Sequence, residues 1–115
     1  MSNTPVFVKG VEETFTAVAR VNRPNDDDGF DVIPLKCRFR VVGLKKQTEL
    51  TAGDDADEKM LQATLISVSG AMKDKEGNDA AWDEETRADM LDRPYYKHAI
   101  LAVYFDRING RKRGN

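Results

Sequence analysis

The single histidine and the single cysteine are the residues of this chain best suited to nucleophilic or acid–base chemistry. A nucleophile needs a base within hydrogen-bond reach. The residues at helical spacing from His98 include no nucleophile. Cys37 alternates with Lys36 and Arg38, which predicts that its thiol points into a core and behaves as a small hydrophobic group. We therefore interpret both residues as structural and expect no catalytic residue and no enzymatic activity.

Acidic residues gather at 26–28 and at 83–85, where they could in principle hold a metal ion. If Gly29 is set as the sixth position of a calcium-binding loop, Pro24 and Leu35 occupy the first and twelfth positions, which require carboxylates. One Cys and one His cannot build a structural zinc site. The acidic residues at 83–85 fit the first turn of a helix, where negative charge is favourable. The chain has no glycine-rich phosphate-binding motif, so we predict no metal and no cofactor.

The chain has 115 residues, of which 40% are hydrophobic and 33% are charged. This composition is typical of one globular domain, residues 1–115. A net charge of −2 lacks the basic excess of a nucleic-acid footprint, so binding of nucleic acid is not expected. We see no signal peptide and no apolar run of about 20 residues, and a lone cysteine suits a reducing compartment. These features predict a cytoplasmic protein that does not bind membranes.

The first part of the chain, about residues 6–43, has the two-residue alternation of β-strands. Residues 13–23 and 30–42 each place small or apolar side chains on one face, and residues 24–29 between them are rich in Pro, Asn, Asp and Gly. This predicts an antiparallel hairpin, in which Pro34 marks a bulge or an edge position because it lacks an N–H group. Residues 6–11 are expected to add a short third strand.

The second part, about residues 54–110, has helical spacing, which makes the expected fold class α+β with about three helices. One helix is expected from about Asp55 to Met72, capped by Asp54 or Asp55, with Glu58 as the capping-box partner if Asp55 is the cap. A second begins at an Asp83 cap and ends before Pro94. A third begins at Pro94 and runs to about residue 109, with Gly110 as its C-cap. The basic tail, residues 111–115, follows.

The last helix carries more apolar surface than the stripe of about 100° that a core-facing helix needs. Leu101 and Phe105 widen its main stripe. We expect part of this surface to bind protein and to make the chain a homo-oligomer. The alternative is that both residues belong to the core and pack against the helix expected at 55–72. The candidate interaction residues are Tyr96, Ile100, Leu101, Tyr104 and Phe105.

The order of these segments carries a further signal. It runs through a strand at 14–21, an acidic-Gly turn at 26–29, a strand at 35–42, an apolar segment at 65–69, a Lys-Glu-Gly-Asn loop at 75–78, a capped helix at 82–92 and a last helix containing 99–105. Over residues 12–115 this order resembles the tail assembly chaperones of long-tailed, siphovirus-type bacteriophages. The family commonly has Gly-Trp near the end of its long helix, where this chain has residues 69–71, and Trp82 comes after the loop.

The resemblance implies a protein that binds the tape measure protein, keeps that long helical chain soluble and helps to recruit tail tube subunits. Such a protein works in the host cytoplasm and is absent from the mature virion. Two alternatives remain open. One is a small structural tail or head–tail connector protein that stays in the virion, and the other is a small nucleic-acid-binding regulator.

Overall fold

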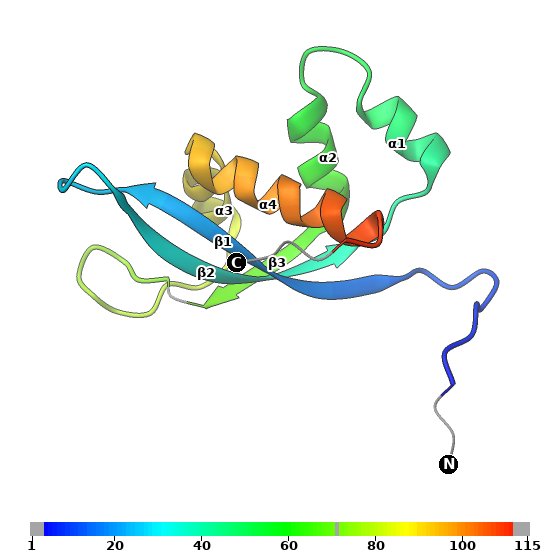
Figure 1. The fold of residues 1–115 in the computed structure, drawn as a ribbon, viewed down its shortest axis with the longest axis horizontal. Coiled ribbons are helices and arrows are strands. Elements are labelled where there is room, and N and C mark those ends of the chain that lie inside the picture. Colours follow the sequence, from blue (N-terminus) through cyan, green and yellow to red (C-terminus); the bar gives the residue numbers. More distant parts are fainter. Residues whose placement is uncertain (1–3, 71, 112–115) are drawn as a thin grey trace.

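The computed structural model describes residues 4–70 and 72–111. A three-stranded antiparallel sheet has the order β1-β2-β3, and helices pack on one of its faces (Figure 1). The α+β fold class is therefore confirmed. The strands are β1 (Thr14–Pro24), β2 (Phe30–Arg40) and β3 (Leu65–Gly70), and the helices within the described ranges are α1 (Leu44–Leu50), α2 (Ala56–Thr64), α3 (Glu84–Leu91) and α4 (Pro94–Ile108).

The predicted hairpin is confirmed as β1 and β2, paired over their full length. Alternation along both strands buries one face, including Ala17 opposite Cys37, against α4, which lies across the sheet and packs mainly on β1 (Figure 1). In the turn, the Asn25 side-chain oxygen accepts hydrogen bonds from the backbone N–H groups of Asp27 and Gly29. Asp28 there adopts a φ of 60°, a conformation that Asp tolerates better than most residues.

An aromatic cluster joins α4 to the open end of this hairpin. The Tyr104 ring lies 5.3 Å from Phe39 and 6.0 Å from Phe15 between ring centroids. Its hydroxyl oxygen accepts a 3.3 Å hydrogen bond from the backbone N–H of Val42. Burial raises the pKa of Tyr104. Aromatic pairs at these distances contribute about 0.5–1.5 kcal/mol beyond the area they bury, so the cluster fixes α4 on the sheet.

The helix expected from Asp55 to Met72 is wrong beyond its first half. The chain leaves α2 after Thr64 and continues as β3, which pairs with β2. The buried residues of this segment, Leu65 and Val68, keep a helix-like spacing, and pairing with the free edge of β2, with a register shift at Arg38 and Phe39, decided the outcome. The β-branched Ile66 and Val68 also favour a strand. The third strand of the sheet is therefore residues 65–70, and the assignment of residues 6–11 as a strand is wrong, because they pair with no strand.

Two smaller expectations also need correction, whereas the edge position expected of Pro34 is found. Helical structure begins with α1 at Leu44, earlier than residue 54, which makes four helices in the described residues instead of about three. Asp55 occupies the N-cap of α2 without a capping hydrogen bond, because its carboxylate pairs with Lys59 at 3.1 Å. Pro34 lies within β2, opposite Arg20 and just beyond the end of β3 at Gly70. The missing N–H group is tolerated there because β3 supplies no partner to it.

The ends of α3 and α4 agree with the sequence-based expectation. The Asp83 carboxylate accepts a 2.8 Å hydrogen bond from the Thr86 N–H, and this bond lowers the pKa of Asp83. Pro94 stands in the first turn of α4. At the other end Gly110 has a φ of +76°, and the N–H groups of Gly110 and Arg111 return to the carbonyls of Arg107 and Asp106. This is a Schellman-type ending. Of the basic tail, residues 112–115 lie outside the described residues.

Candidate protein-binding groove

The five candidate interaction residues of α4 do not form one surface. Ile100 and Tyr104 are fully buried and Leu101 is 7% exposed, so these three belong to the core. Leu101 shares that core with residues of α2, which is the alternative left open above. Phe105 is partly buried and packs edge-on against Tyr104, with ring centroids 5.4 Å apart. Tyr96 is also partly buried, and it lines a groove.

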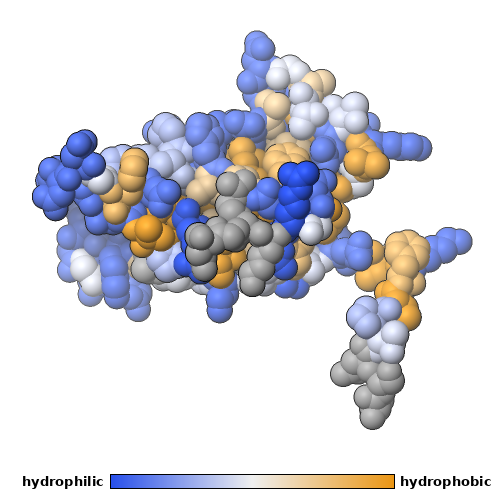
Figure 2. All heavy atoms as spheres, in the orientation of Figure 1, coloured by the Kyte–Doolittle hydropathy of each residue, from blue (hydrophilic) through white to orange (hydrophobic). Residues whose placement is uncertain are grey.

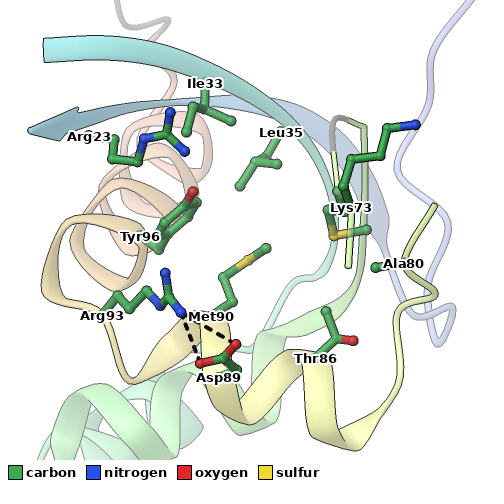
Figure 3. A pocket seen from close by; sticks show the side chains of 11 residues that line it. Arg23, Ile33, Leu35, Lys73, Ala80, Thr86, Asp89, Met90, Arg93 and Tyr96 are labelled. Atoms are coloured by element: carbon green, nitrogen blue, oxygen red, sulfur yellow. Dashed lines mark hydrogen bonds and ion pairs between the residues drawn. The ribbon is translucent and has the colours of Figure 1, made fainter. Parts of the chain in front are cut away.

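This groove lies between the far end of the hairpin, the segment after β3, and the helices α3 and α4 (Figure 3). Its volume is about 460 Å³. Apolar side chains from all four parts line its interior, and Figure 3 shows them converging from the sheet and from the helices. We call the following set the groove floor: Ile33, Leu35, Met72, Met90 and Tyr96.

Charged side chains surround the groove floor, and each cation has an acidic partner. Arg23 pairs with Asp31 at 3.2 Å, Arg93 pairs with Asp89 at 3.2 Å, and Lys73 pairs with Asp79. The hydrogen bond that Arg23 donates to Asp31 raises the pKa of Arg23, and the bond that Arg93 donates to Asp89 raises the pKa of Arg93. The rim is therefore charged but locally balanced, and it favours no net charge in an occupant.

The segment that closes one side of the groove is a small turn built by local bonds. Ala80 donates its N–H to the Met72 carbonyl at 3.0 Å, and Lys73 bridges to Asp79. Within the turn the Asp74 carboxylate accepts from the N–H groups of two later residues, Glu76 and Asn78. The residues that reach the groove from this segment, Met72, Lys73 and Ala80, are held at the base of the turn.

An apolar floor inside a polar rim is the arrangement found at the centre of protein–protein contacts. Methionine side chains are unbranched and polarizable, so they adapt to irregular apolar partners. Met72 and Met90 are both only partly buried in the isolated chain. The groove can therefore accept apolar side chains from a partner and cover them, while the rim bonds to polar groups around them.

Two other depressions lie beside α3, and their linings differ. One is lined by Glu58, Gln62, Glu84, Arg87 and neighbouring residues, and the other by Gln62, Trp82, Asp83 and their neighbours. Charged and polar groups dominate both linings. They lack the continuous apolar floor of the groove, which makes the groove the better candidate for binding a partner's apolar side chains.

The sheet face opposite α4 is open to solvent and carries basic side chains. Arg20, Lys36 and Arg38 are exposed there in alternating positions of β1 and β2. Arg38 donates hydrogen bonds to the hydroxyls of Thr16 and Thr14. The only acidic residue in the three strands is Asp31, whose register places it on the other face. This face therefore has a positive charge although the chain as a whole is slightly acidic.

Sequence reasoning found Tyr96 but missed the rest of the groove floor. Met72 was assigned to the end of a helix, and with that assignment it could not lie beside α3. Thr86 and Met90 are four residues apart, so the sequence alone indicates that they share one side of a helix, the side of α3 that lines the groove. The sequence does not show which segments lie beside this side of α3, because their position depends on residues 65–70 forming a strand.

Within residues 4–70 and 72–111, no cluster of three or more His, Cys, Asp or Glu side chains is arranged to hold a metal ion. No helix in the same ranges is both long and apolar enough to span a bilayer. Comparisons with protein-family models, with curated proteins and with solved structures gave no significant match to this chain.

Proposed function

We propose that this protein is a tail assembly chaperone of a long-tailed bacteriophage. In the host cytoplasm it binds the tape measure protein, keeps that chain soluble and helps to recruit tail tube subunits, without catalysis. The ordered resemblance of residues 12–115 to that family supports the proposal, and the groove is the structural observation that carries it. A helical client presents apolar side chains along one stripe, and an apolar groove with a polar rim fits such a stripe.

The groove suits a chaperone because its methionine side chains are adaptable and its floor is partly solvated. A client that must be released during tail assembly should be held by few strongly buried contacts. Met90 and Tyr96 each retain exposed area in the free chain, and that area is what a client would cover. Burying one such side chain fully is worth about 1.5–3 kcal/mol, so a few of them give useful but reversible affinity.

Two variants test the groove in different ways. Met90→Gln removes part of the apolar floor, and Ala80→Trp fills the groove from the turn without deleting a buried contact. Each variant is co-expressed with the tape measure protein of the same phage, and the amount of client that co-purifies is measured. We expect both to retain about a tenth or less of the client, a loss that corresponds to about 1.4 kcal/mol or more.

Leu44→Gln is the matched control, since Leu44 is an apolar side chain, 82% exposed, on α1 and outside the groove lining. It should retain the client, and all three variants should melt within a few degrees of the wild type. Full client recovery with Ala80→Trp would refute the groove as the binding site. Failure of the wild-type chain to bind or to solubilise the client would refute the chaperone function itself.

The open basic face of the sheet favours a second candidate, a nucleic-acid-binding regulator. Arg20 and Lys36 lie there without a carboxylate on the same face of the strands. Binding through such cations must weaken steeply as salt increases, because bound counterions are released. Fluorescence anisotropy with labelled DNA and RNA at low and moderate salt decides between the candidates. Tight, salt-sensitive binding that Arg20→Glu removes would favour the regulator.

A further inference from the structure

The segment before β1 presents large apolar side chains to solvent. We call residues 6–11 the N-terminal arm. Figures 1 and 2 show it leaving the sheet and projecting from the body, with hydrophobic side chains along it. Val6 is 74% exposed, Phe7 84%, Val8 54% and Val11 60%. These four form the densest run of exposed large apolar residues in the described chain, and such a run marks an interaction site.

The arm is held away from its own sheet at its junction with β1. The Glu13 carbonyl accepts a 2.9 Å hydrogen bond from the Val41 N–H, and the Glu12 carboxylate pairs with the Arg40 guanidinium at 3.1 Å. These contacts extend the hairpin past Thr14 and direct the chain outward. Beyond them, Gly10 has a φ of +80° and turns the arm further away (Figure 1). Its large apolar side chains are therefore left exposed by the part of the chain that the structure describes.

The sheet has a long free edge that could receive such a segment. β1 spans eleven residues and pairs only with β2, so within residues 4–70 and 72–111 no strand pairs with its other side. Because Glu13 bonds to Val41, alternation gives the even-numbered residues of β1 the backbone groups that point outward. Val18, in the middle of this edge, is 44% exposed. A long open edge strand is a template for pairing with another strand.

We propose that two copies of this chain exchange their arms, each arm adding as an antiparallel strand to the free edge of β1 in the other copy. Both the donor strand and the receiving edge belong to the same chain, so one two-fold axis satisfies both at once. A register that sets Val8 opposite Val18 also sets Val11 opposite Phe15, and apolar side chains then meet on both faces of the sheet. Each three-stranded sheet thereby gains a fourth strand from the other copy.

This arrangement differs from self-association through α4, because Leu101 is already in the core. It also does not depend on the groove, which lies at the far end of the hairpin from the arm (Figures 1 and 3). Each chain has one exposed apolar arm and one free β1 edge. A second copy of the chain is therefore favoured over an unrelated strand, because it supplies both an edge for the arm and an arm for the edge. One association therefore covers both features.

The first test uses the full chain and a pair of matched substitutions. Val8→Lys places a charge in the arm, and Val32→Lys places the same charge at a valine of nearly equal exposure, 57% against 54%, on β2. Mass is measured by sedimentation velocity up to about 100 μM, where dimers with micromolar dissociation constants are well populated. We expect dimers for the wild type and Val32→Lys, and dimerisation at least about tenfold weaker for Val8→Lys. A monomeric wild type, or equal dimerisation of the two variants, would overturn the proposal.

The second test examines the partner strand itself. A chain carrying both Val8→Cys and Val18→Cys should form a covalent dimer under mild oxidation, because each cysteine meets its counterpart in the other copy. Neither single variant should do so, since two-fold pairing keeps the two Val8 positions apart and the two Val18 positions apart. Cys37 is fully buried and does not compete. A dimer that yields no cross-link in the double variant would contradict pairing of the arm with β1.

Discussion

Alkaline pH should destabilise this protein through Cys37. The side chain is fully buried in the centre of β2, where its sulfur lies 3.7 Å from the Leu35 carbonyl. Burial raises the pKa of the thiol to about 12, from 9.0 for an exposed thiol. The folded chain thus holds this proton more tightly than the unfolded chain. The resulting stability is complete below pH 9 and is lost as pH rises toward 12.

The size of the effect follows from the two pKa values. Between pH 8 and pH 10 the unfolded thiol ionises while the folded thiol stays protonated, which lowers the free energy of unfolding by about 1.3 kcal/mol at ~1.36 kcal/mol per pH unit. An unfolding entropy of ~2.1 cal/mol/K per residue over 115 residues converts this into a fall in melting temperature of about 5 °C.

The measurement compares urea unfolding of the wild type and Cys37→Ala at both pH values. Every other ionisable group is present in both proteins, so the contributions of these groups cancel in the difference. The wild type should lose about 1.3 kcal/mol more than the variant on going from pH 8 to pH 10. An equal loss in both proteins would refute the buried-thiol explanation. So would rapid reaction of the native thiol with a thiol reagent at pH 8, since only an exposed thiolate reacts quickly.

Two further predictions concern single hydrogen bonds that position the helices. Tyr104→Phe removes the hydrogen bond from the Val42 N–H and keeps the ring, so the free energy of unfolding, measured by thermal unfolding, should fall by about 0.5–1.5 kcal/mol. A fall beyond about 3 kcal/mol would mean that the ring packing had changed. Asp83→Ala removes a formed helix cap, whereas Asp55→Ala removes only an exposed ion pair with Lys59. The melting temperature should therefore fall further for Asp83→Ala, and equal falls would contradict the assigned cap.

The hairpin could be predicted because its signals are local. The alternation on both sides of residues 24–29 defined two strands and their buried face, and the pattern needed no knowledge of the helices. The same holds for the start of α3 at Asp83 and of α4 at Pro94, where side-chain chemistry at one position sets the boundary. These are the parts of the fold in which neighbouring residues decide the structure.

The third strand and the groove could not be predicted because they depend on distant residues. Leu61, Leu65, Val68 and Met72 satisfy a helical period, and only the unpaired edge of β2 makes residues 65–70 a strand. Once that strand forms, Met72 moves beside α3 and the groove exists. The excess apolar surface of α4 was correctly recognised, but most of it is covered by the core. Most of the large exposed apolar side chains in the described residues lie instead on the arm and the hairpin.

Methionine methyl groups test the client-binding groove most directly. The chain has four methionines, of which Met72 and Met90 line the groove and Met60 is 1% exposed in the core. In a protein labelled with ¹³C at the methionine methyls, a helical segment of the tape measure protein is added and NMR spectra are recorded. The proposed function predicts that the Met72 and Met90 signals shift in a saturable manner while the Met60 signal stays in place. Binding of the client without any change at Met72 and Met90 would contradict it.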